Sequence, residues 1–173
     1  MKLIEAVSLK RLVVYPVLLI ALLVETGFST PALFGVTVSI VYPSLLAASF
    51  VLDEKEIAVA GLVLGIAIDF QSLHVGLNAV FFAITLYFIA VSLKTFLNRN
   101  IATFSVVSAI AVTLYETVCF IFYLVVKGKI PFFEGLLKIT APKALLAFGV
   151  AMLCYGIFAF FRYRFSKQWD RSK

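Results

Sequence analysis

The chain has 173 residues, of which 63% are hydrophobic and 14% are charged. A soluble domain usually contains about 25% charged and about 45–50% apolar residues. This balance excludes an ordinary soluble protein, and it predicts an integral membrane protein with no room for a sizeable soluble domain. The net charge of +6 is interpreted first as membrane topology and not as nucleic-acid binding.

Runs of apolar residues predict six membrane-spanning helices in one all-α bundle, a single domain over residues 1–173. The spans are expected at about 12–28, 32–52, 57–70, 77–96, 101–126 and 144–161. Pro43 predicts a bend within the second span. The third span is shorter than the roughly 20 residues that cross a bilayer core. Either this helix is short, or the segment through His74 continues at membrane depth and is buried against protein.

The distribution of basic residues predicts the orientation. With six spans, 11 of the 15 Lys and Arg residues fall on the side that carries both termini. Because cytoplasmic segments are enriched in Lys and Arg, both termini are expected in the cytoplasm. The other four lysines lie at 127–143, where apolar residues at helical spacing predict a short helix in the headgroup layer.

The most informative stretch runs from residue 60 to residue 79. Gly61, Gly65 and Asp69 are each four residues apart, so on a helix they form one stripe, and Gly76 closes the polar turn that follows. Small residues at this spacing let a neighbouring helix approach closely, and a carboxylate at this depth must face protein or water. The stripe is either a partner-binding surface or internal packing, and the sequence leaves both open.

Candidate catalytic and metal-binding groups are few. One histidine and two separated cysteines, Cys119 and Cys154, offer no set of converging metal ligands, and both cysteines lie in apolar runs typical of packing. His74 and Glu116 are therefore interpreted as buried polar residues, with Glu116 in the middle of the fifth span. An acid–base pair of Asp69 and Glu116 would require both carboxylates to face one cavity. The simpler interpretation is that each carboxylate is hydrogen-bonded separately, with Glu116 close in sequence to Thr113, Tyr115 and Thr117.

The central stretch resembles the bacterial rod shape-determining protein MreD family. The shared pattern is glycine, three residues, glycine, three residues, aspartate, then a short turn and a Gly-Leu-x-Ala entry to the next helix. In this chain its residues are Gly61, Gly65, Asp69, Ser72, Gly76, Leu77 and Ala79. Looser similarities are the proline before the second span, the basic turn after the fourth, the acid inside the fifth, and the basic end.

This resemblance implies a non-enzymatic scaffold of the cell-elongation machinery that helps to organise peptidoglycan synthesis in the bacterial cytoplasmic (inner) membrane. The implied partners are the single-span membrane protein MreC and, through it, the actin-like MreB, a SEDS glycosyltransferase and a class B penicillin-binding protein, together with membrane lipid. No cofactor is implied. The fold is expected to resemble the substrate-binding S component of energy-coupling-factor transporters.

Two alternatives follow. The chain is an S component that binds a small molecule, or it is an intramembrane enzyme that uses Asp69 and Glu116. An S component often repeats small residues in its first helix, whereas the first span here offers only Ala21 and Gly27. The scaffold is therefore the preferred interpretation.

Overall fold

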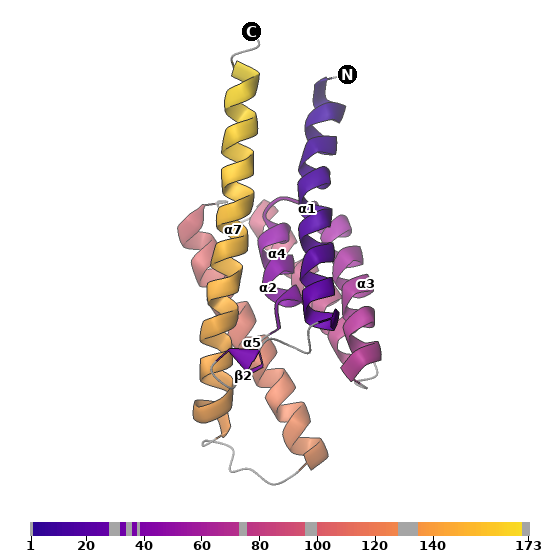
Figure 1. Ribbon diagram of the computed structural model, residues 1–173, viewed down its shortest axis with the longest axis vertical. Coiled ribbons are helices and arrows are strands. Elements are labelled where there is room, and N and C mark those ends of the chain that lie inside the picture. Colours follow the sequence, from indigo (N-terminus) through magenta and orange to yellow (C-terminus); the bar gives the residue numbers. More distant parts are fainter. Residues whose placement is uncertain are drawn as a thin grey trace.

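The computed structural model describes residues 2–27, 32–33, 36–37, 39–72, 76–95, 100–127 and 135–170. These residues form a helical bundle (Figure 1). In chain order the elements are α1 (Lys2–Gly27), β1 (Ala32–Leu33), β2 (Val36–Thr37), α2 (Val41–Ser49), α3 (Glu54–Ser72), α4 (Leu77–Thr95), α5 (Ile101–Lys127), the π-helix η1 (Leu136–Thr140) and α7 (Ala141–Asp170).

Three of these helices are long and apolar enough to cross a membrane: Leu77–Thr95, Ile101–Val125 and Leu136–Phe160. The helices α4 and α5 closely match the spans predicted at 77–96 and 101–126. Two other helices are longer than the spans predicted at 57–70 and 144–161: α3 begins at Glu54, and α7 continues to Asp170. The apolar part of α1, Val13–Gly27, is shorter than these three helices.

The second predicted span is organised differently from our expectation. Within 32–52, the strands β1 and β2 pair antiparallel, with Ala32 opposite Thr37, and the helix that follows has only nine residues. Pro43 is the third residue of this helix. In a first turn the missing proline N–H breaks no helical hydrogen bond, so Pro43 is compatible with a helix start and does not bend a long span.

The short helix α2 lies at the centre of the bundle. All nine of its residues are buried, and it packs against α1, α3, α4, α5 and α7. Beside it, α3 and α4 form an antiparallel hairpin with the most extensive helix–helix contact in the described chain. The bundle is therefore built around a half-length apolar helix that the longer helices enclose.

Aromatic rings fill the space between α2, α4 and α5. Tyr42 stacks on Phe82 with ring centroids 4.8 Å apart, and its ring lies 4.6 Å from that of Tyr115. Phe81 lies 5.8 Å from Tyr42 and 5.4 Å from Tyr115. Such clusters add roughly 0.5–1.5 kcal/mol per pair to the free energy gained by burying apolar area.

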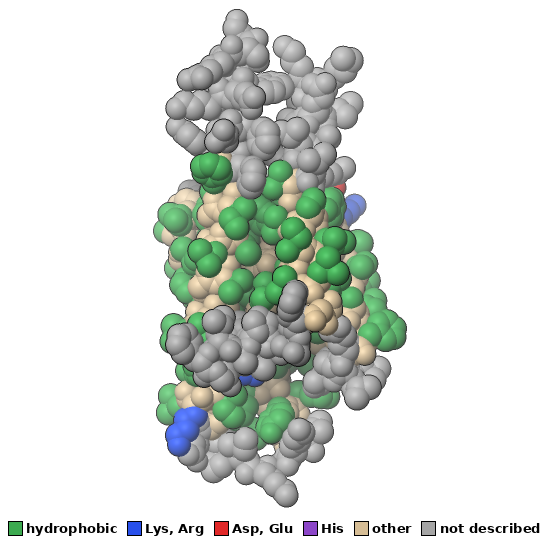
Figure 2. Space-filling view, viewed as in Figure 1, with side chains coloured by type: hydrophobic (Ala, Val, Ile, Leu, Met, Phe, Trp, Pro, Cys, Tyr) green, Lys and Arg blue, Asp and Glu red, His purple; other side chains and the backbone are tan. Residues whose placement is uncertain are grey.

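The outside of the bundle is apolar as well. Hydrophobic side chains are spread over the described central part of the face in Figure 2, and few charged side chains appear among them. Large exposed side chains include Phe70, at 83% exposure, and Leu145, at 72%. A helix that is hydrophobic all round is buried in protein or in lipid. The exposed apolar surface is therefore consistent with a membrane protein.

The residues between α5 and α7 depart from the predicted headgroup-layer helix. Residues 136–140 form a π-helix that leads directly into α7, so this part is the first turn of a long helix and not a separate element. Residues 128–134, which make up much of the rest of the predicted segment, lie outside the described residues.

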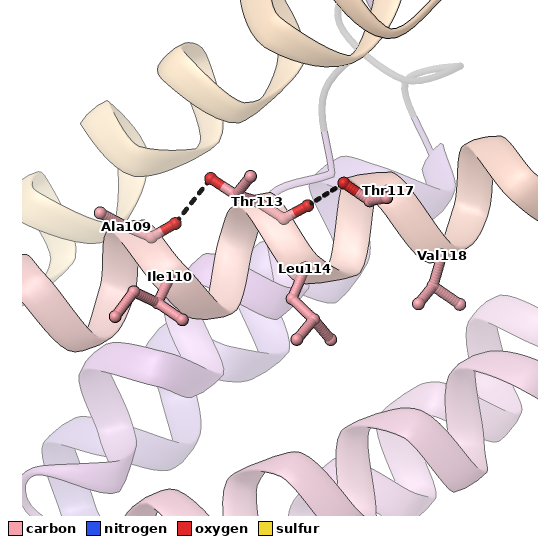
Figure 3. A pocket seen from close by; sticks show the side chains of 6 residues that line it. All are labelled: Ala109, Ile110, Thr113, Leu114, Thr117 and Val118. Atoms are coloured by element: carbon pink, nitrogen blue, oxygen red, sulfur yellow. Dashed lines mark hydrogen bonds between the residues drawn. The ribbon is translucent and has the colours of Figure 1, made fainter. Parts of the chain in front are cut away.

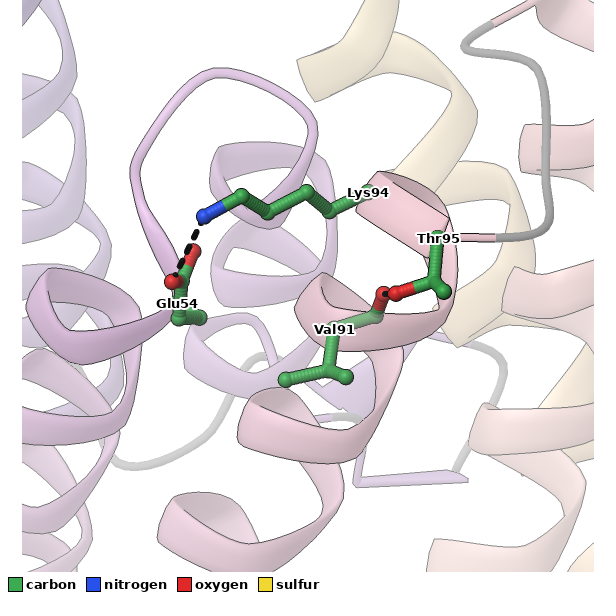
Figure 4. A network of polar contacts seen from close by, with 4 residues as sticks. All are labelled: Glu54, Val91, Lys94 and Thr95. Atoms are coloured by element: carbon green, nitrogen blue, oxygen red, sulfur yellow. Dashed lines mark hydrogen bonds and ion pairs between the residues drawn. The ribbon is translucent and has the colours of Figure 1, made fainter.

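An exposed ion pair joins the start of α3 to the end of α4 (Figure 4). Lys94 Nζ donates a 2.9 Å hydrogen bond to Glu54 Oε1, and this bond lowers the pKa of Glu54 below its ordinary value of 4.5. Because the folded-state pKa is the lower one, the contribution to stability is present above pH 4.5 and is lost as the pH falls through the folded value.

Exposed ion pairs contribute little to stability, and the Lys94 side chain is 64% exposed. We therefore expect Glu54→Gln to leave the thermal unfolding midpoint at pH 7 unchanged in detergent. A clear decrease in that midpoint would show that this contact holds the α3–α4 hairpin together, contrary to our account.

Candidate functional site

The two glycines of the predicted stripe lie against α4. A Cβ at Gly61 would be 2.8 Å from Leu86 Cδ1 and 3.2 Å from the carbonyl carbon of Phe82. A Cβ at Gly65 would be 2.5 Å from the Cα of Ala79 and 2.6 Å from its nitrogen. Side-chain bulk at Gly65 would therefore collide with the backbone of α4. Of the two alternatives for the stripe, the structure places it in internal packing.

Asp69 links the end of α3 to the start of α4. Its Oδ1 accepts the backbone N–H of Asn78 at 3.1 Å and the Asn78 side-chain amide at 2.9 Å, and its Oδ2 accepts the N–H of Ala79 at 3.0 Å. The first N–H groups of a helix have no intrahelical acceptor, and the helix dipole favours a negative charge there. Asp69 therefore caps α4 from the neighbouring helix.

The same network extends to α5. The side-chain oxygen of Asn78, Oδ1, accepts a 2.9 Å hydrogen bond from the Tyr115 hydroxyl. All three side chains are buried, with Asp69 8% exposed. Asp69, Asn78 and Tyr115 thus form one buried chain of hydrogen bonds across α3, α4 and α5. The sequence offered no signal that Asn78 and Tyr115 belong to it, because their contacts join residues far apart in the chain.

Gly76 begins the turn into α4 with φ +78°, in the left-handed region that favours glycine. A Cβ there would meet nothing within 4 Å, so the requirement for glycine is conformational and not steric. His74, predicted as a buried polar residue in this turn, lies outside the described residues.

Glu25 has the role that Asp69 has, at a different helix start. It is 7% exposed, and its Oε2 accepts the backbone N–H groups of Ile40 at 2.8 Å and Val41 at 2.6 Å. The Ser39 hydroxyl donates to Oε1 at 3.0 Å. An acid near the end of one helix caps the next helix in both cases, α1 to α2 and α3 to α4. Glu25 was not among the predicted site residues, because its role as a cap depends on where α2 begins.

Glu116 is placed differently. It is 6% exposed, and among the described residues no side chain or backbone group hydrogen-bonds to it. Lys143 on α7 attracts it electrostatically and Glu25 repels it. The polar neighbours that we expected to satisfy it form bonds elsewhere: Thr113 to Ala109 O, Thr117 to Thr113 O, and Tyr115 to Asn78.

The two cysteines have free thiols. Cys154 is buried, with its sulfur 3.4 Å from the Ser44 hydroxyl, and Cys119 is half-buried on α5. Both lie within the bundle, in keeping with the packing role that their apolar surroundings predict.

A shallow, open groove lies along the outer face of α5 (Figure 3). It is lined by two rows of residues at four-residue spacing, Ala109, Thr113 and Thr117, and Ile110, Leu114 and Val118. Both threonine hydroxyls donate to the carbonyl four residues earlier, at 2.7 Å. With these hydroxyls engaged, the groove offers an apolar surface. The name α5 face is used below for these six residues.

Comparison of the chain with family models, with curated proteins and with solved structures gives no match.

Proposed function

We propose that this protein is a non-enzymatic membrane scaffold of the bacterial cell-elongation machinery, which binds the single membrane helix of MreC. The observation that carries the proposal is the fit among the residues by which the chain resembles the MreD family. Gly65 contacts Ala79, Asp69 caps Ala79, and Gly76 supplies the turn between them. The motif thus has one physical purpose, the closure of the α3–α4 hairpin.

The alternatives fit the described residues less well. An intramembrane acid–base pair needs two available carboxylates, whereas both oxygens of Asp69 accept backbone N–H groups of α4. An S component needs room for a ligand in its bundle, whereas the Tyr42, Phe82 and Tyr115 rings pack together between α2, α4 and α5. Both observations favour a scaffold.

The partner helix requires a surface other than the glycine stripe, since α4 already packs there. We assign it to the α5 face. Close packing drives helix association in lipid, and small residues at four-residue spacing allow it. Ala109, Thr113 and Thr117 provide that spacing, and Ile110 and Leu114 beside them provide apolar contact area.

Bulk on the α5 face should therefore weaken partner binding while leaving the bundle folded. We expect Thr113→Leu with Thr117→Leu to reduce co-purification of MreC in mild detergent by tenfold or more, which corresponds to about 1.4 kcal/mol. The unfolding midpoint should stay close to that of the unaltered protein, because Thr113 is exposed and Thr117 is only half-buried.

The matched control is Gly149→Leu on α7, where a Cβ would meet nothing within 4 Å. It adds similar bulk away from the α5 face and should leave co-purification intact. Full recovery of MreC with the double threonine variant would remove the α5 face from the proposal. Failure of the unaltered chain to recover any elongation protein would refute the function itself.

A further inference from the structure

The helices α5 and α7 pack against each other and run antiparallel (Figure 1). On α5, the Ser105 hydroxyl donates a 3.6 Å hydrogen bond to the Met152 sulfur of α7. Eleven residues further along α5 is Glu116, and eleven residues back along α7 is Ala141. Because both helices rise about 1.5 Å per residue, Glu116 lies at the level of the junction between η1 and α7. The helix η1 also packs against α5.

Two polar side chains at this level face into the bundle. Glu116, at 6% exposure, continues a buried row on α5 with Val112 and Phe120, each four residues away. Thr140, at 3% exposure, begins a buried row that continues on α7 with Ala147. Thr140 is also the last residue of η1, and single π-helical turns are frequent at functional sites. The buried sides of α5 and α7 thus bring Glu116 and Thr140 to one level between the two helices.

Neither buried group has a hydrogen-bond partner in the described part of the chain, which holds for the Glu116 carboxylate and for the Thr140 hydroxyl. Lys143 follows Thr140 by three residues, so the two lie on the same side of the helix. The half-buried Lys143 attracts Glu116, and no hydrogen bond between described residues joins them. A buried polar or charged group without a partner is costly. The name α5–α7 site is used below for Glu116, Thr140 and Lys143, which together favour a molecule that both donates and accepts.

The α5–α7 site lies at the edge of the hydrocarbon layer. Helices α3 and α4 have 19 residues each and are therefore about 28 Å long, close to the roughly 30 Å of a hydrocarbon core. The exposed pair of Glu54 and Lys94 lies at one end of this hairpin. At the other end, which points away from both termini, Asn78 accepts the Tyr115 hydroxyl (Figure 1). Glu116 directly follows Tyr115, so the site is at the level of the lipid headgroups on that side.

We infer that the α5–α7 site binds the phosphoethanolamine headgroup of a phospholipid. The headgroup ammonium donates to the Glu116 carboxylate, and the headgroup phosphate accepts from the Thr140 hydroxyl and the Lys143 ammonium. Access is along α7, where Ala141 is exposed and Lys143 is half-buried. The lipid is the source of this group that the position favours, because the site is at the headgroup level of a bundle with an apolar outside.

The charges at the site favour phosphoethanolamine over other headgroups. Glu25 lies near enough to repel Glu116, so a cation beside Glu116 is attracted by two carboxylates. A phosphocholine ammonium has no N–H to donate, and a phosphoglycerol headgroup has no cation. The site is on the buried side of α5, whereas the α5 face is on its outer side. The inference therefore stands whether or not MreC binds there.

The test is native mass spectrometry of the full chain in detergent, titrated with phosphatidylethanolamine or with phosphatidylcholine of the same acyl chains. We expect phosphatidylethanolamine to bind about tenfold more tightly, and Glu116→Gln to remove most of this preference. Thr140→Val should instead weaken both lipids by a similar factor, because both carry the phosphate. The control, Glu54→Gln, removes a carboxylate at the other end of the α3–α4 hairpin and should change neither affinity nor preference.

Equal binding of the two lipids by the unaltered chain would overturn the inference without the need for any variant. An unchanged preference in Glu116→Gln, or an equal loss of preference in Glu54→Gln, would overturn it as well. Displacement of the lipid by the same concentration of free O-phosphoethanolamine would assign the site to a soluble compound. The thermal unfolding midpoint shows whether each variant is folded. If Glu116→Gln or Thr140→Val is not, Lys143→Gln at a half-buried position takes its place and should weaken both lipids.

Discussion

Replacing Gly65 with leucine is expected to prevent the α3–α4 hairpin from closing. A Cβ at this position would lie 2.5 Å from the Ala79 Cα and 2.6 Å from its nitrogen, and backbone cannot move aside as a side-chain tip can. Even Gly65→Ala should lower the free energy of unfolding by about 1–3 kcal/mol, and the leucine variant should exceed this range. The measurement is the thermal unfolding midpoint of purified protein in detergent.

A graded series separates packing from a general effect of substituting glycine. Gly61→Ala should cost less than Gly65→Ala, because its closest neighbour is the flexible Leu86 side chain. Gly149→Ala should cost nothing, since no atom lies within 4 Å of the added Cβ and alanine favours a helix over glycine. Equal midpoints for the Gly65 and Gly149 variants would refute the close approach of α3 to α4.

Asp69→Leu is expected to be the second most damaging change. It would leave three buried donors without an acceptor, namely the backbone N–H groups of Asn78 and Ala79 and the Asn78 amide. Each unsatisfied buried group costs about 1–3 kcal/mol, so a loss of about 3 kcal/mol or more in unfolding free energy follows. The unfolding midpoint in detergent measures this loss.

Asp69→Asn distinguishes hydrogen bonding from simple occupancy of the site. Its single carbonyl oxygen can still accept from Asn78, but its NH₂ group would face the Ala79 N–H. An intermediate loss is therefore expected, between the unaltered protein and Asp69→Leu. If leucine and asparagine have the same small effect, Asp69 does not cap α4.

The parts of the fold that the sequence predicted well depend on local pattern. Apolar runs of sufficient length located α4 and α5 to within one residue of their bounds. Regular spacing identified Gly61, Gly65 and Asp69 as one stripe, and the need for a turn identified Gly76. In each case the relevant property belongs to neighbouring residues on one helix, so no knowledge of tertiary contacts was needed.

The second segment was predicted poorly for a physical reason. Residues 32–52 are apolar enough to span a bilayer, but hydropathy cannot distinguish lipid contact from burial in protein. The structure uses Val41–Ser49 as a helix buried by five other helices, and it pairs Ala32–Leu33 with Val36–Thr37. The cap from Glu25 follows from this arrangement, which explains why it could not be predicted before the start of α2 was known.

The structure was also needed to show which helix packs against the glycine stripe. The four-residue spacing of small residues allows a close approach by another helix of the same chain or by a helix of a partner, and it does not distinguish the two. Only the contacts of Gly65 with Ala79 place α4 there. The α5 face was not predicted at all. In the sequence its threonines count as polar residues, and only the structure shows that their hydroxyls donate to the α5 backbone.

The central claim is that Gly61, Gly65 and Asp69 hold α3 against α4, so that the partner helix binds at the α5 face instead. The most direct measurement is site-specific photo-crosslinking in a rod-shaped bacterium, with the photoreactive residue at Leu114 on α5 or at Ile66 on α3, which are 48% and 41% exposed. We predict a crosslink to MreC from position 114 and none from position 66. A crosslink from position 66 alone would contradict the account.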